Sequence, residues 1–212
     1  MSEAVILLHG LARSASSMAK LEGALSDNGY EVLNIDYPST KHDIEALADL
    51  AIAEPVARLQ HKSSIHFVTH SMGGILVRHF LHENTLPNLG KVVMLGPPNH
   101  GSEVVDKLHK LPGFKTVNGP AGLQLATNDQ SVPNQLGPAD FELGIIAGSR
   151  SINLILSTLI PQPNDGKVSV ESSKVDGMND HLTLPVTHTF MMRNKEVIEQ
   201  VLGFLQNGEF QT

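Results

Sequence analysis

The amino-acid sequence predicts an α/β fold in which a mostly parallel central sheet is covered by helices on both faces. Short, nearly continuous apolar runs alternate with longer segments of helical character through most of the chain. Strands that are buried on both faces have such apolar runs, and parallel strands need a crossover between them, usually a helix. The length of 212 residues suits one domain with a substantial core, so we expect residues 1–212 to form a single domain.

The first elements alternate in order from the N-terminus. Ala4–Leu8 is wholly apolar and predicts the first strand, and residues 15–28 predict a helix that Gly29 closes. Glu31–Ile35 predicts the second strand, because Val, Leu and Ile dominate it. Residues 44–60 then predict a long helix.

Five further elements are expected after residue 60. Residues 65–68 are β-branched and aromatic and predict a buried strand, and the apolar segment 75–81 predicts a helix that follows it closely. Residues 91–95 and Leu143–Gly148 are continuous apolar runs that predict two more strands. Residues 196–205 predict the terminal helix.

Two long segments interrupt this alternation. Residues 97–139 are rich in Gly, Pro, Asn and Gln, and only residues 104–111 among them suggest a helix. Residues 157–186 are similarly rich in loop-forming residues. In an open α/β sheet, ligands bind beyond the carboxyl ends of the strands, where long loops supply the pocket walls. We expect these two segments to form such walls.

The charge balance and residue counts exclude several kinds of function. The chain has 15 Lys and Arg residues against 22 Asp and Glu residues, which gives a net charge of -7. Nucleic acid and an anionic membrane surface are not expected as partners, because both are bound through clustered positive charge. The absence of cysteine excludes disulfides and a cysteine nucleophile. The histidines show no metal-ligand spacing and the glycines form no dinucleotide fingerprint, so we expect no metal and no cofactor.

The N-terminal segment predicts a cytoplasmic protein. Met1-Ser2-Glu3 leads directly into an apolar strand, without the basic start, longer apolar stretch and cleavage site of a secretory signal. No segment approaches the roughly 20 apolar residues that are needed to cross a bilayer. We also expect a monomer or a small homo-oligomer.

The sequence Thr69-His70-Ser71-Met72-Gly73-Gly74 stands directly between a predicted strand and a predicted helix. The chain must turn sharply there, and glycine permits the close approach of backbone and helix. A serine at such a corner is held in a strained, exposed conformation, with the helix N-terminus beside it. The pattern therefore predicts that Ser71 is a nucleophile.

A serine nucleophile needs a general base, a carboxylate that orients the base, and amides that bind the oxyanion. His188 follows a strand-like segment and precedes the last helix, and Asp165 lies in a tight turn after the last strong strand. The amides of Leu11 and Met72 are the predicted oxyanion donors.

Other residues compete for two of these roles. His181 is the alternative base, and His188 is favoured because the base should lie on a loop immediately before the last helix. The alternative acids are Asp140, Asp176 and Asp180. Asp165 is favoured over them because the acid should follow the carboxyl end of a strand.

Three further histidines are candidate substrate-binding residues. His9 is expected to brace the loop that carries the oxyanion donor, rather than to transfer protons. His70 is expected to shield the corner around Ser71. His100 either lines the pocket or belongs to a structural turn.

The chain resembles the compact α/β-hydrolases of the serine esterase and lipase type over nearly its whole length. The likeness includes Val5-Ile6-Leu7-Leu8-His9-Gly10, the segment 13–18 behind it, and the turn that begins at Asp165-Gly166-Lys167. Leu95-Gly96-Pro97-Pro98-Asn99-His100-Gly101-Ser102 resembles a loop of bacterial lipases and of the deacylases that trim lipid anchors. Thr69 departs from the usual glycine, and no large helical cap domain is present.

The resemblance implies a Ser71–His188–Asp165 triad that acts through an acyl-enzyme, in a fold with no strands before Ala4. We expect the protein to hydrolyse carboxylic esters of short to medium acyl chain length, with a small-molecule ester or lipid-like molecule as substrate. A thioesterase or an acyltransferase with the same triad is the close alternative. A non-catalytic α/β-hydrolase scaffold that serves as a binding module is the alternative from another class.

Overall fold

The computed structural model describes residues 2–152 and 157–211, and residues 1, 153–156 and 212 of the expected 1–212 domain lie outside them. A six-stranded sheet has the order β2-β1-β3-β4-β5-β6, and every neighbouring pair is parallel. The strands are β1 (Ala4–Leu8), β2 (Glu31–Ile35), β3 (Ile65–His70), β4 (Leu89–Leu95), β5 (Leu143–Gly148) and β6 (Asp180–Leu184). The predicted α/β fold with a parallel sheet is confirmed.

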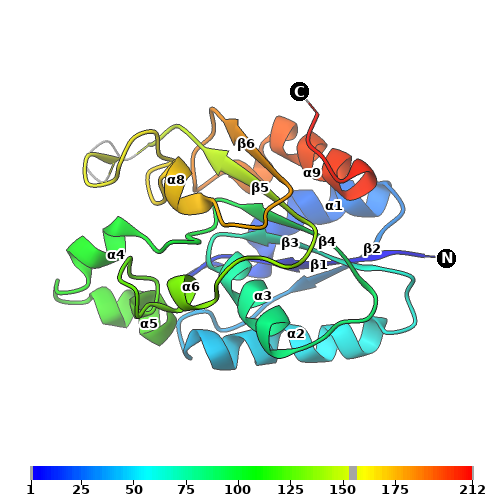
Figure 1. The fold of residues 1–212 in the computed structure, drawn as a ribbon, viewed down its shortest axis with the longest axis horizontal. Helices are drawn as coiled ribbons and strands as arrows, with labels where there is room; N and C mark the ends of the chain where they lie inside the picture. The colour runs from blue at the N-terminus through cyan, green and yellow to red at the C-terminus, as the bar shows by residue number, and fades with distance from the viewer. Residues whose placement is uncertain (1, 153–156, 212) are drawn as a thin grey trace.

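Helices lie on both faces of this sheet (Figure 1). The helices are α1 (Ala19–Asp27), α2 (Ile44–Leu59), α3 (Met72–Glu83), α4 (Glu103–Leu108), α5 (Phe114–Leu123), α6 (Val132–Gln135), α8 (Val170–Ser173) and α9 (Lys195–Asn207), with 3₁₀ turns η1 (Ala15–Met18) and η2 (Met191–Arg193). Figure 1 shows α2 and α3 on one side of the sheet and α1 and α9 on the other. The small helices α4, α5 and α6 gather at one end of it.

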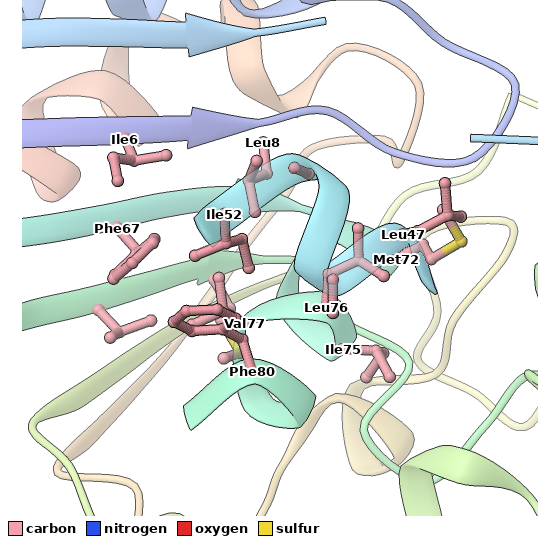
Figure 2. Packing of buried hydrophobic residues seen from close by; sticks show 14 of the residues in the cluster. Ile6, Leu8, Leu47, Ile52, Phe67, Met72, Ile75, Leu76, Val77 and Phe80 are labelled. Atoms are coloured by element: carbon pink, nitrogen blue, oxygen red, sulfur yellow. The ribbon is translucent and has the colours of Figure 1, made fainter. Parts of the chain in front are cut away.

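Alternation along β1 explains how one sheet supports two cores. Ile6 and Leu8 pack with α2 and α3, whereas Val5 and Leu7 pack with α1 and α9. Successive strand residues point to opposite faces, so a strand buried on both faces must be apolar at every position. Figure 2 shows Ile6, Leu8 and Phe67 of the sheet against side chains of α2 and α3.

The structure differs from the predicted elements mainly in the two long segments. Residues 97–139 contain α5 and α6 in addition to α4, which spans Glu103–Leu108 rather than 104–111. Asn, Gly and Pro disfavour a helix interior, and α5 is indeed kinked at Gly119, where φ is 67°. The predicted helix 15–28 divides into η1 and α1.

Residues 157–186 contain α8, which the sequence did not predict, and the sixth strand, β6, which the sequence indicates only as a strand-like segment before His188, without bounds. Asp180, His181 and Thr183 are polar, so Asp180–Leu184 lacks the continuous apolar run found in β1. As an edge strand, β6 pairs only with β5 and stays partly exposed, which is why polar residues are tolerated there. The carboxyl ends of β1, β3 and β5 bring their loops to a common edge of the sheet.

Candidate active site

Ser71 lies at the turn between β3 and α3. Its backbone has φ 54° and ψ -123°, a conformation that residues with a side chain rarely adopt. The Ser71 amide donates a hydrogen bond to the Leu95 carbonyl at 2.8 Å, which ties the turn to the end of β4. Because α3 begins at Met72, its unpaired N–H groups and the positive end of its dipole lie next to this serine.

The close approach of α3 to the end of β1 requires glycine at position 73. A Cβ atom there would lie 2.8 Å from the Leu8 carbonyl oxygen and 3.0 Å from the His9 carbonyl oxygen. We expect Gly73→Ala to lower the free energy of unfolding by about 2 kcal/mol, because backbone carbonyls must shift to admit the methyl group. Urea unfolding curves measure this change.

Gly23→Ala is the matched control for this substitution. Gly23 lies in α1 at an exposed position, and no atom lies within 4 Å of an added Cβ. Alanine there should raise the free energy of unfolding by about 0.5–1 kcal/mol, because glycine disfavours helix interiors. Wild-type stability in Gly73→Ala would contradict the close approach.

The His188 imidazole lies between Ser71 and Asp165. Its Nε2 atom is 3.0 Å from Ser71 Oγ, and its Nδ1 atom is 2.7 Å from Asp165 Oδ2. His188 and Asp165 are buried, whereas Ser71 is half-buried. An Nδ1–H that donates to the carboxylate leaves Nε2 able to accept the serine hydroxyl. The structure thus brings together the three side chains that the sequence analysis selected from distant loops.

The Asp165 carboxylate is fixed by the backbone of its own turn. Its Oδ1 atom accepts hydrogen bonds from the amides of Lys167 at 2.9 Å and Val168 at 2.8 Å. Gly166 has φ 96°, which favours glycine at this position. The His188 amide donates to the Asp165 carbonyl at 3.1 Å, so the two loops are also joined through the backbone.

Asn164 supports this turn, and the sequence analysis did not identify it. The side chain is buried, and its Oδ1 atom accepts hydrogen bonds from Ser157 Oγ at 3.0 Å and the Gly166 amide at 2.9 Å. Its Nδ2 atom donates to the carbonyls of Ser157 at 3.1 Å and Ile160 at 3.3 Å. The sequence Asn-Asp-Gly signals a turn, but it does not reveal these contacts with the preceding loop.

The alternative base and acids make other contacts. His181 lies in β6, where its Nε2 atom is 3.1 Å from Ser173 Oγ. Asp180 accepts a hydrogen bond from the His181 amide at 2.8 Å. Asp140 and Asp176 line separate surface depressions rather than the cavity beside Ser71.

His9 holds the loop that follows β1. Its ring is buried and stacks on Tyr37 with 4.1 Å between the ring centroids. Nδ1–H donates to the Gly10 carbonyl at 2.9 Å, and Nε2 accepts from the Tyr37 amide at 3.3 Å. Burial is the main cause that lowers the pKa of His9, which keeps the ring neutral. The loop carries Leu11, whose predicted role as an oxyanion donor, together with Met72, stays a prediction.

His70 lies directly beside His188, with 4.8 Å between the two ring centroids. Its Nε2–H group donates to the His188 carbonyl at 2.9 Å, while its buried Nδ1 atom has no partner within the described residues. Burial first, and then the charge that His188 can carry, lower the pKa of His70 well below its usual value. The ring therefore stays neutral while it holds the His188 backbone.

This burial makes stability depend on pH. The folded protein resists protonation of His70, whereas the unfolded chain protonates it below about pH 6.5. The unfolded state therefore binds more protons, so the free energy of unfolding falls as pH is lowered through this value. We expect His70→Gln to reduce the slope between pH 6.5 and pH 5 by up to about 1.4 kcal/mol per pH unit.

Urea unfolding at several pH values tests this expectation. The control position is His82, whose side chain is exposed beside Glu83, and His82→Gln should keep the wild-type slope. An unchanged slope in His70→Gln would show that this histidine is not buried in its neutral form.

A cavity of about 90 Å³ opens beside Ser71 and His188. Its apolar wall includes Leu11, Val104, Val105, Phe114, Leu125 and Val168, and its polar lining includes Arg13, His70, Ser102, Asn118 and Lys167. Both long segments thus contribute to the cavity wall, as the sequence predicts.

The three predicted substrate-binding histidines lie in different places. His70 lines the cavity, whereas His9 lies beneath the loop after β1 and is not part of the lining. His100 is exposed in a neighbouring depression, where its Nδ1 atom is 3.1 Å from Asn134 Oδ1. The lining residues Arg13, Ser102 and Lys167 lie in segments that carry the family resemblance, but the sequence does not show that their side chains meet at one cavity.

Within residues 2–152 and 157–211, no group of three or more histidine and carboxylate side chains is placed to hold a metal ion. No helix in this part of the chain is both long enough and apolar enough to span a bilayer.

The parallel sheet with helices on both faces, with a serine at the turn after β3, defines an α/β-hydrolase fold. The chain belongs to the alpha/beta hydrolase family, whose model matches residues 5–156. No curated protein matches the chain.

Solved structures share this fold at low sequence identity. The mature lipase BlEst2 of Bacillus licheniformis is 19% identical, with a TM-score of 0.78 over 95% of this chain and 91% of that one. The product of gene lin2722 from Listeria innocua is 19% identical, with a TM-score of 0.67 over 100% and 96% of the two chains. The metagenomic carboxyl esterase MGS0156 is 18% identical, with a TM-score of 0.68 over 88% and 64%.

Proposed function

We propose that this protein is a serine hydrolase that cleaves carboxylic esters through a Ser71–His188–Asp165 triad. The observation that carries the proposal is the hydrogen-bonded chain from Ser71 Oγ through the His188 ring to Asp165, with distances of 3.0 Å and 2.7 Å. The strained backbone of Ser71 also supports it, because such strain concentrates at functional sites. The names of the lipase and the carboxyl esterase with the same fold agree with this class of reaction.

In this mechanism, Ser71 Oγ attacks the ester carbonyl while His188 Nε2 accepts the hydroxyl proton. Asp165 keeps the Nδ1–H tautomer of His188 and stabilises the imidazolium that forms. The amides of Leu11 and Met72 donate to the oxyanion, each contributing about 3–4 kcal/mol. The imidazolium then protonates the leaving alcohol, which leaves an acyl group on Ser71.

Water completes the cycle by the reverse sequence of proton transfers. His188 accepts a proton from the water, the resulting hydroxide adds to the acyl carbonyl, and Ser71 leaves with the proton that the imidazolium returns. His70 and Asn164 are positioning residues in this scheme, because they hold the backbone of the base and the turn of the acid.

The cavity supports short to medium acyl chains. Its volume is about 90 Å³ and its apolar wall includes Val104, Phe114 and Leu125. We expect 4-nitrophenyl butyrate and hexanoate to be hydrolysed faster than the palmitate ester. Adding butyryl thioesters to this substrate series measures whether the protein also takes acyl groups from sulfur.

Covalent labelling with a fluorophosphonate probe tests the function directly. The activated hydroxyl of Ser71 should displace fluoride from phosphorus, and peptide mass spectrometry should locate the adduct on Ser71 alone. Wild-type protein that hydrolyses no ester in the series and gains no adduct would instead favour a binding module. The exposed Ser26 in α1 serves as an internal control, since it is not part of the cavity lining beside His188.

A further inference from the structure

Two cationic side chains line the cavity beside Ser71. Arg13 comes from the loop after β1, and Lys167 comes from the turn that carries Asp165. The two residues are far apart in the sequence, yet they lie near enough for the charge of Arg13 to act on Lys167. The cavity therefore presents two positive charges next to the nucleophile proposed above.

Neither cation has a side-chain partner among the described residues, although the charge of Asp165 acts favourably on Lys167. The side chains of Arg13 and Lys167 form no ion pair and no hydrogen bond in the part of the chain that the structure describes. No aspartate or glutamate belongs to the described cavity lining. The nearby Asp165 is already occupied, since Oδ1 accepts from two backbone amides and Oδ2 contacts His188.

Arg78 shows how this fold treats a cation that has only a structural role. Its buried guanidinium donates to the Asn99 carbonyl at 3.2 Å, to Asn99 Oδ1 at 3.1 Å and to the Gly137 carbonyl at 2.6 Å. Both terminal nitrogens of this guanidinium thus have acceptors in the protein. The two cavity cations have no such acceptor among the described residues, which leaves their N–H groups available to a bound ligand.

The repulsion between Arg13 and Lys167 also favours an anion as the ligand of this cavity. The pKa of the Lys167 ammonium group is lowered, first by desolvation where the group enters the cavity and second by the positive charge of Arg13. The rest of the residue is exposed. Two like charges that lie close together repel each other, and an anion between them removes this repulsion. The chain as a whole carries a net charge of -7, whereas the cavity lining contains two cations and no aspartate or glutamate, so the charge at the cavity is positive.

We propose that Arg13 and Lys167 bind an anionic oxygen group of the substrate, either a carboxylate or a phosphate. The substrate is then an amphiphilic ester, with its hydrocarbon part against Val104, Phe114 and Leu125 and its anionic group between the two cations. Guanidinium and ammonium groups bind such oxygens through charge-assisted hydrogen bonds. This inference rests on the proposed ester hydrolysis and narrows its substrate class.

The kinetic test compares one neutral and two anionic esters. The neutral ester is 4-nitrophenyl butyrate, and the anionic ones are 3-carboxy-4-nitrophenyl butyrate and mono-4-nitrophenyl glutarate, which carry the carboxylate on the alcohol and acyl sides. The measured quantity is the ratio of anionic to neutral kcat/KM. For one of the two anionic esters, Arg13→Gln and Lys167→Gln should each lower this ratio about tenfold.

Charge-retaining variants and a distant lysine serve as controls. Arg13→Lys and Lys167→Arg should keep the ratio within about threefold of wild type, because the positive charge remains. Lys195→Gln removes an exposed cation at the start of α9, away from the cavity, and should leave the ratio unchanged. Ratios that are equal in wild type and in both glutamine variants would overturn the inference.

A binding measurement tests the same site without turnover. Isothermal titration of wild-type protein with hexyl phosphate, hexanoate and hexanol should show tighter binding of the anions, and the comparison of phosphate with carboxylate identifies the preferred group. Arg13→Gln and Lys167→Gln should weaken anion binding about tenfold, and added salt should weaken it further. Anions that bind no better than hexanol would overturn the inference.

The kinetic and binding tests distinguish a failure of the proposed anion site from a failure of the proposed ester hydrolysis. If no ester is hydrolysed but anion binding depends on both cations, the proposed function fails and the anion site stands. If esters are hydrolysed while the ratio and the anion affinity are the same in all variants, the anion site fails and the proposed function stands.

Discussion

Replacement of Ser71 by alanine is expected to reduce hydrolysis of 4-nitrophenyl butyrate by at least about a thousandfold. The remaining groups can still bind the ester and polarise its carbonyl, but no acyl-enzyme can form. The fold should persist, because the hydroxyl contacts His188 at the surface of the cavity and the packing of α3 does not depend on it. Steady-state kinetics and circular dichroism on the same preparations measure both properties.

Two further variants make this result specific. Ser71→Gly should lose the same activity but raise the free energy of unfolding by about 1 kcal/mol, because glycine adopts φ 54° without strain. Ser26→Ala, on the exposed surface of α1, should keep wild-type activity. Purified Ser71→Ala that retains more than about a tenth of the activity would contradict the proposed nucleophile.

The sequence predicted the central strands because their burial leaves a simple pattern. β1 is apolar at every position, and β4 and β5 contain the apolar runs 92–95 and Leu143–Gly148, because these stretches are buried on both faces. In β3 the apolar residues Phe67 and Val68 lie between His66 and Thr69. The bounds of the edge strand β6 and the kinked helix α5 escaped prediction, because tertiary contacts rather than local propensity hold these elements. In α5, the chain passes so close to Thr40 that a Cβ on Gly119 would lie 2.0 Å from the Thr40 carbonyl oxygen.

Some residues of the candidate site could be predicted from the sequence, and others could not. Ser71, Asp165 and His188 could be selected because each sits in a turn with recognisable residues, in a chain order that one fold shares. Asn164 and Lys167 could not, because their roles depend on which loops meet in space. The role of Gly96, directly after β4, also depends on contacts in space. A Cβ there would lie 3.0 Å from Asp165 Oδ2 and 3.2 Å from His188 Nδ1, so only glycine lets the chain pass this close to the two side chains.

Replacement of His188 by alanine should be as damaging as replacement of Ser71, with a loss of at least about a thousandfold in kcat for 4-nitrophenyl butyrate. Without the imidazole, the Ser71 hydroxyl has no acceptor for its proton, and the buried Asp165 carboxylate cannot reach it directly. His181→Ala is the matched control, because His181 was the alternative base and contacts Ser173 instead. It should keep activity within about threefold and lower the free energy of unfolding by about 1 kcal/mol.

The double variant Ser71→Ala/His188→Ala distinguishes a joint role from two separate ones. Groups that act as one unit are not additive, so the double variant should be no slower than either single variant. Losses that multiply would mean that the 3.0 Å contact between Ser71 Oγ and His188 Nε2 does not carry the proton. A thousandfold loss in His181→Ala together with an active His188→Ala would assign the base to β6 and would leave the Asp165–His188 pair a structural one.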